Sequence, residues 1–84
     1  MSVTIDRKTG EDLAFRALMQ AGLMNYDLRT KLLGESSQSI TQEEQGLIRQ
    51  ALNSLEFYTE DRQEAMLCRA LLQAHEEFDY LIGE

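Results

Sequence analysis

The strongest helical pattern in the chain lies in residues 59–82, TEDRQEAMLCRALLQAHEEFDYLI. At a helical pitch one stripe collects the apolar residues Leu67, Ala70, Leu71, Ala74, Phe78 and Leu81, and one flank of it adds Cys68, Leu72, His75 and Ile82. Arg69 and Gln73 fall on the opposite side. Because a lone helix with so wide an apolar face is unstable in water, other helices of the same chain or of a partner must cover it.

Residues 10–33 predict a first helix with apolar residues around more than half of its circumference. Thr9 and Asp12 have the spacing of a capping box at its start, and Gly34 is suited to end it in the left-handed conformation. Gly22 lies inside this pattern at a cost of about 1 kcal/mol relative to alanine. A kink or a break between Gly22 and Asn25 is therefore an alternative, and it would turn the first helix into two short ones.

Residues 42–58 predict a second helix, since Thr41 and Glu44 have capping-box spacing and follow the apolar Ile40. Its predicted buried stripe is Leu47, Ile48, Ala51, Leu52, Leu55 and Tyr58. The pattern loses register near residues 57–61, which favours a tight turn with Thr59 capping a third helix over residues 60–82, although a single bent helix stays an alternative. Residues 1–8 are expected to form a flexible tail.

These patterns predict one all-α domain over residues 1–84, a small bundle of three helices, or of four if the first one breaks near Gly22. A domain of 84 residues has a small core, and its single cysteine, Cys68, allows no internal disulfide. Oligomerisation is a usual compensation in such small domains, so we expect a dimer.

Charge and hydropathy restrict the classes of partner. The chain has 15 acidic and 8 basic residues, a net charge of −7, and its basic residues are scattered rather than grouped. Direct nucleic-acid binding and attraction to anionic membranes are therefore disfavoured, while a protein partner with a basic surface is favoured. No apolar run approaches the ~18 residues of a membrane span, no signal peptide is recognisable, and we expect a cytoplasmic protein.

Chemistry-bearing residues are sparse. Cys68, His75 and Asp79 would offer a thiol, a base and an orienting carboxylate, but two helical turns separate the thiol from the imidazole. Neither CxxC nor HxxxH spacing accompanies them, and one helix supplies too few ligands for a structural zinc site. We therefore predict no catalytic residues, no metal site and no cofactor, and a buried structural role for Cys68.

The apolar surface left after three helices pack together predicts association with a protein through a helix-in-groove or helix-on-helix interface. The expected interface residues lie on two faces, one in the first helix and one on the flank of the last: Phe15, Met19, Leu23, Tyr26, Leu72, His75, Phe78 and Ile82.

A resemblance to a known family rests on several segments. They are the helix end with Leu28, Leu32, Leu33 and Gly34, the capped start Ile40–Thr41, residues 52–56 (LNSLE), residues 65–71 (AMLCRAL) and the SVTID start. In these the chain resembles the small enterobacterial biofilm-development and two-component-connector family of the YmgB/AriR type. The resemblance implies an all-helical dimer that modulates a response regulator or a transcription factor through protein contacts.

Two further functions share the size, acidity and helical make-up of this sequence. One is a small secretion chaperone or phage-type inhibitor that masks a client protein. The other is a nucleic-acid mimic that uses acidic residues to bind a basic nuclease or DNA-binding protein.

Overall fold

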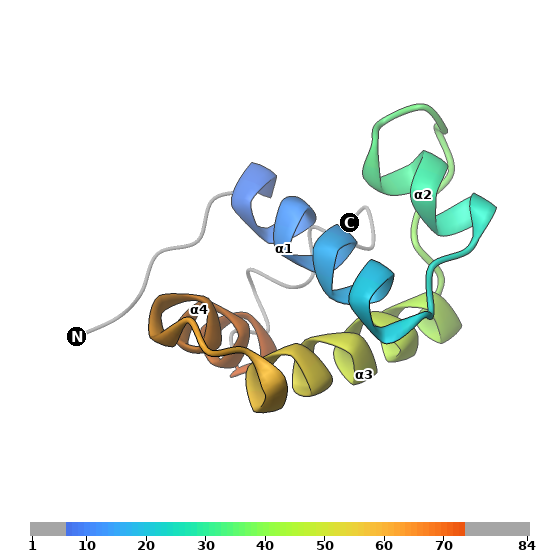
Figure 1. The fold of residues 1–84 in the computed structure, drawn as a ribbon. Coiled ribbons are helices and arrows are strands. Elements are labelled where there is room, and N and C mark those ends of the chain that lie inside the picture. Colours follow the sequence, from blue (N-terminus) through green and yellow to red (C-terminus); the bar gives the residue numbers. More distant parts are fainter. Residues whose placement is uncertain (1–6, 74–84) are drawn as a thin grey trace.

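The computed structural model describes residues 7–73, which form four α-helices and no strand (Figure 1). The helices are α1 (Arg7–Ala21), α2 (Tyr26–Leu32), α3 (Gln42–Tyr58) and α4 (Arg62–Gln73). The predicted all-α class is confirmed, in its four-helix form.

The central helix is α3, because it packs against α1 along one side and against α4 along another. The side chains that are fully buried between these helices and α2 are Leu13, Leu18, Leu28, Ile48, Leu52, Cys68 and Leu71. Ala14, Ala17 and Ala51 are also fully buried, and their small side chains let α1 and α3 approach closely. The predicted stripe of the second helix is correct at its centre but wrong at Tyr58, whose side chain is exposed.

The first predicted helix, residues 10–33, is broken. Gly22 adopts φ +71°, and two hydrogen bonds close a Schellman turn there: Leu23 N donates to Leu18 O at 2.9 Å, and Gly22 N donates to Met19 O at 3.3 Å. A new helix then begins, because the Asn25 side chain accepts a hydrogen bond from Leu28 N at 2.8 Å. The continuous helix was therefore wrong, and the alternative break between Gly22 and Asn25 is confirmed.

The start of α1 also differs from the prediction. The helix begins at Arg7, so Thr9 lies inside it and the expected capping box at Thr9 and Asp12 is wrong. Arginine and lysine are good helix formers, which is consistent with the extension of the helix through residues 7 and 8. The remainder of the expected tail, residues 1–6, lies outside the described residues.

Gly34 ends α2 as expected. It adopts φ +76°, and its N–H donates to Lys31 O at 3.3 Å while Glu35 N donates to Thr30 O at 2.8 Å. These two bonds form a second Schellman turn.

Replacing Gly34 with alanine should lower the free energy of unfolding by about 1 kcal/mol. No atom lies within 4 Å of the added Cβ, so the cost is that of the left-handed backbone alone. Gly46 is a matched control, because it lies in α3 with similarly open surroundings, and Gly46→Ala should stabilise the protein by up to about 1 kcal/mol. Urea unfolding of both variants checks the prediction, and effects of the same sign would contradict it.

The capping box of α3 is present as predicted. Thr41 Oγ1 accepts from Glu44 N at 3.2 Å, and Glu44 Oε1 accepts from Thr41 N at 2.9 Å. The amides of Thr41 and Glu44, which have no acceptor within the helix, therefore each have a hydrogen-bond partner.

The turn between α3 and α4 separates two helices, as preferred from the sequence. Its cap, however, is Asp61 and not Thr59: Asp61 Oδ1 accepts from Gln63 N at 2.9 Å and from Glu64 N at 3.2 Å. Thr59 instead ends α3, and its hydroxyl oxygen accepts from Asp61 N at 3.1 Å. The predicted third helix, residues 60–82, is described only as far as Gln73, and residues 74–82 lie outside the described part of the chain.

Candidate protein-interaction surface

Large apolar side chains stay exposed at the end of α3 and on α4. Phe57 is 79% exposed, Tyr58 is 77% exposed and Met66 is 61% exposed. The core stripe of α3 ends at the buried Leu55, so the last turn of this helix runs past the part that its neighbours cover. The rings of Phe57 and Tyr58 pack edge to face, with centroids 4.9 Å apart and an interplanar angle of 76°.

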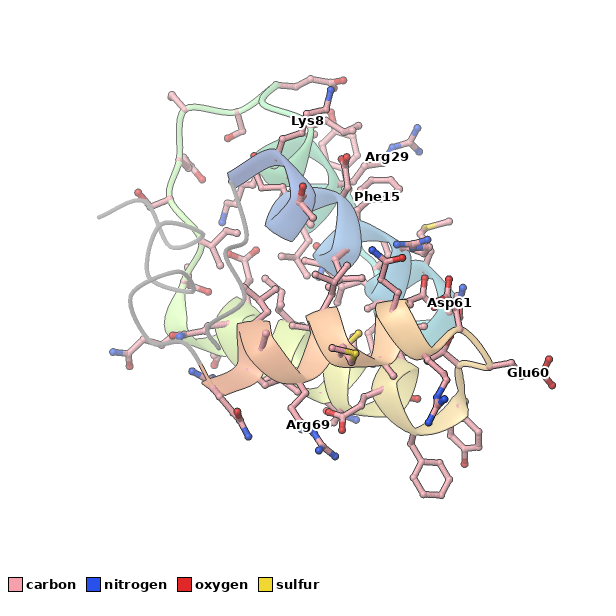
Figure 2. All side chains as sticks on the ribbon, turned by 90° about the vertical axis from the view of Figure 1, so that its left-hand side faces the viewer. Lys8, Phe15, Arg29, Glu60, Asp61 and Arg69 are labelled. Carbon is pink, nitrogen blue, oxygen red and sulfur yellow. The ribbon has the colours of Figure 1, made fainter. Side chains whose placement is uncertain are left out.

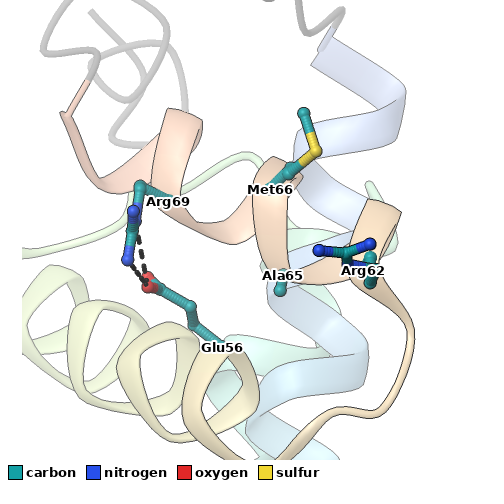
Figure 3. Close-up of a pocket in the computed structure, with 5 residues that line it drawn as sticks. All are labelled: Glu56, Arg62, Ala65, Met66 and Arg69. Atoms are coloured by element: carbon teal, nitrogen blue, oxygen red, sulfur yellow. Dashed lines mark hydrogen bonds and ion pairs between the residues drawn. The ribbon is translucent and has the colours of Figure 1, made fainter.

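Met66 also borders an open pocket of about 700 Å³, which is lined by Glu56, Arg62, Ala65, Met66 and Arg69 (Figure 3). The four residues from α4 are spaced at i, i+3, i+4 and i+7, so they share one face of the helix. We call the three exposed apolar residues together with the lining of this pocket the α3–α4 surface.

An ion pair forms one wall of the pocket. Arg69 donates to Glu56 Oε2 from Nε at 3.2 Å and from Nη2 at 3.1 Å, which joins α4 to α3. The Arg69 side chain is largely exposed and lies on the side of α4 that faces away from α1 (Figure 2), so the pair contributes at most about 1 kcal/mol to stability. Its main effect is to fix the position of a charged group beside Met66.

Glu64 holds the turn below this surface in place. Its carboxylate accepts from the Thr59 hydroxyl at 2.7 Å and pairs with Arg16 of α1 at 2.8 Å. One side chain thus links α1, the α3–α4 turn and α4. Contacts within the chain therefore fix the α3–α4 turn beside this surface.

The interface residues that the sequence predicted differ in their exposure in the structure. Met19 and Tyr26 are exposed, whereas Phe15, Leu23 and Leu72 are partly buried and pack against the core. The other three predicted residues, His75, Phe78 and Ile82, lie outside the described residues.

The predicted interface residues do not include Phe57 or Met66, and the predicted core stripe of the second helix includes Tyr58. Met66 is, with Met19 and Met24, a candidate in the sequence for an adaptable binding surface. A usable signal was present, because Phe57 falls outside the apolar stripe of its helix, next to a turn. Aromatic residues are enriched at protein interfaces, so an aromatic residue in that position is a candidate interface residue.

Cys68 is fully buried, as predicted. The pKa of its thiol is raised to about 11, mainly by burial and in smaller part by the charges of Glu64 and Glu56, while the charge of Arg16 opposes the rise. At neutral pH the thiol is therefore protonated, which is an unreactive state for a nucleophile. Within residues 7–73 no three His, Cys, Asp or Glu side chains are grouped so that they could hold a metal ion.

Glu44 is a charged residue that is buried at the start of α3. Its Oε1 accepts from Lys31 Nζ at 2.6 Å, and only 12% of the Glu44 side chain and 8% of the Lys31 side chain are exposed. Burial raises the pKa of Glu44, but the hydrogen bonds from Lys31 and Thr41 and the charge of Lys31 outweigh it and hold the pKa below its ordinary value.

This lowered pKa predicts a pH dependence. A carboxyl group whose pKa is lower in the folded state stabilises the fold above its unfolded pKa, and that contribution is lost as the pH falls through the folded pKa. Glu44→Gln, which keeps a capping side chain, should therefore destabilise the protein at pH 7 but not once the pH lies well below the ordinary value of 4.5. Urea unfolding at pH 7 and pH 3 checks this, with Glu43→Gln as control. A Glu44→Gln deficit of equal size at both pH values would be the contrary result.

The described residues thus define a small all-α bundle with an uncovered apolar surface at the α3–α4 turn. The sequence matches no protein-family model, and neither the curated proteins nor the solved structures contain a match. In the described part of the chain, every helix is too short or too polar to cross a membrane.

Proposed function

We propose that the protein is a small, cytoplasmic, non-enzymatic regulator or adaptor that acts by binding another protein through the α3–α4 surface. The observation that supports this most is the exposure of Phe57 and Tyr58 at the end of α3 and of Met66 on α4, where Met66 also lines an open pocket. Aromatic residues and methionine are enriched at protein interfaces, and methionine adapts to differently shaped partners.

The geometry of the surface suits a partner helix. An open groove between two helices that is apolar at Ala65 and Met66 and flanked by Arg62 and Arg69 matches the helix-in-groove mode of recognition. The net charge of −7 adds long-range attraction to a protein with a basic surface. The family resemblance implies a response regulator or a transcription factor as the partner.

Self-association belongs to the same proposal. A second copy of the chain would cover Phe57, Tyr58 and Met66 in the absence of another partner, so the isolated protein is proposed to be a homodimer.

The second candidate is a secretion chaperone or phage-type inhibitor that masks a client through the same exposed side chains. The two functions differ in stoichiometry. A regulator of the proposed kind is a dimer before it meets its partner, whereas a masking protein is a stable monomer that forms a 1:1 complex with its client. Sedimentation at micromolar concentration, with and without the captured partner, separates these functions.

Site-specific photocrosslinking in the native cell tests the proposal. A photoreactive residue at position 57 or 66 should give the same partner adduct, identified by mass spectrometry. Position 12 is a suitable control, because Asp12 is exposed on α1. Identical adducts from position 12, or no adduct from positions 57 and 66, would argue against the α3–α4 surface.

A further inference from the structure

Among the described helices, α2 has the weakest attachment. It has seven residues, whereas an isolated helix needs about 12 to 15 to be even marginally stable in water. Its packing against α1 is less extensive than the packing of α3 against either α1 or α4, and only two of its apolar residues, Leu28 and Leu32, are buried. The contacts of a few residues with the other helices therefore determine whether α2 stays packed against the core.

Both ends of α2 have the geometry of a hinge. Gly22 precedes it at φ +71° and Gly34 follows it at φ +76°, and each ends a helix in a Schellman turn. In Figure 1, α2 lies at one end of the molecule, with an irregular connection on either side. Such turns absorb backbone rotation without changing the helices next to them.

The Lys31–Glu44 ion pair connects this helix to α3. Its two side chains are almost buried and its atoms lie 2.6 Å apart, so water screens the attraction much less than at a surface pair. The same oxygen, Glu44 Oε1, also accepts the Thr41 N–H of the capping box. One carboxylate therefore both fixes the start of α3 and holds α2 against it.

The helix also has apolar residues on more than one side. Leu28 and Leu32 point into the core, while Tyr26 at its start and Leu33 at its cap are exposed. A helix with apolar residues on two sides can pack through either side.

We propose that α2 is a hinged lid, closed by the Lys31–Glu44 pair, that opens as a unit about Gly22 and Gly34 while α1, α3 and α4 remain folded. Opening withdraws Leu28 and Leu32 from the core and uncovers the apolar surface that they occupy. The lid is independent of the α3–α4 surface and does not rest on the function proposed for it.

Hydrogen exchange of the full chain, read residue by residue by NMR, tests the lid. Lys31→Met removes the ion pair but keeps an apolar stem and leaves the capping box intact. The amides of Arg29, Leu33 and Glu35, which are bonded to Asn25, Arg29 and Thr30, should exchange about 10- to 100-fold faster, because a seven-residue helix that leaves the core loses its internal hydrogen bonds. The amide of Thr59 at the far end of α3 should keep its wild-type rate.

Thr41→Ala is the matched control. It removes the hydroxyl that accepts from Glu44 N but leaves Lys31 paired with Glu44, so the amides of Glu44 and Gln45 should exchange faster and those of α2 should not. Equal acceleration of all amides in Lys31→Met, or none in α2, would overturn the lid.

Wild-type protein provides a second measurement that needs no substitution. In low concentrations of urea, the exchange rates of the α2 amides should rise less steeply with urea concentration than those of the α3 amides. The reason is that opening α2 alone exposes less surface than unfolding the whole chain. Exchange of α2 only through global unfolding would exclude a separate opening.

Discussion

Leu52→Ala is expected to lower the free energy of unfolding by about 2 to 5 kcal/mol. Leu52 is fully buried on α3, the helix that packs against both α1 and α4, so its loss leaves a cavity that neighbouring helices cannot fill. A domain of this size has a total stability of about 5 to 15 kcal/mol. Urea unfolding followed by circular dichroism measures the change.

Leu33→Ala is the matched control for this prediction. Leu33 is 48% exposed and should lose less than about 1 kcal/mol, since truncating it removes little buried area. If Leu33→Ala costs as much as Leu52→Ala, a second copy or another molecule covers Leu33 in solution, and the arrangement of the core needs revision.

The second large effect concerns binding. Phe57→Asp combined with Met66→Asp should weaken the complex with the crosslinked partner, or the homodimer, by about 30-fold or more, because exposed aromatic anchors contribute 2 kcal/mol or more each in protein interfaces. The stability of the folded chain should change by about 0.5 kcal/mol or less, since both side chains are exposed. Titration calorimetry for a partner, or sedimentation for a homodimer, measures the first quantity and urea unfolding the second.

Met19→Asp combined with Tyr26→Asp is the matched pair for this experiment. Both residues are exposed and both belong to the face of the first helix that the sequence predicted as an interface. The affinity should stay within a few-fold of wild type if the partner binds only the α3–α4 surface. A large loss in this pair, with none in Phe57→Asp and Met66→Asp, would move the interface to the face that the sequence indicated.

Local signals in the sequence located both ends of α3 and the end of α2. Thr41 and Glu44 form the predicted capping box, and Gly34 is the predicted left-handed cap. These features depend on residues within one turn of each other, so spacing alone is sufficient to find them. The break at Gly22 was recognised only as an alternative, because an isolated glycine in a helical pattern is compatible with both a kink and an end.

The surface was less predictable because exposure depends on which neighbour covers each side of a helix. Tyr58 continues the apolar stripe of α3, yet the helix extends beyond the core at that residue. In the last helix, Cys68 and Leu71 are fully buried while Leu67 is only partly buried, so the centre of the buried face lies nearer the flank than the helical wheel indicated. The exposure of Tyr58 and the position of the buried face of α4 both depend on how the helices pack together, which a helical wheel for one helix does not show.

Hydroxyl-radical footprinting of the full chain, alone at low concentration and in complex with its partner or as a dimer, tests the proposed interaction most directly. Phe57, Tyr58 and Met66 all have reactive side chains that are exposed in the isolated chain. The proposal predicts that their oxidation slows several-fold in the complex, while Met19 and Tyr26 react as before. Unchanged oxidation of Phe57, Tyr58 and Met66 in a fully formed complex would contradict it.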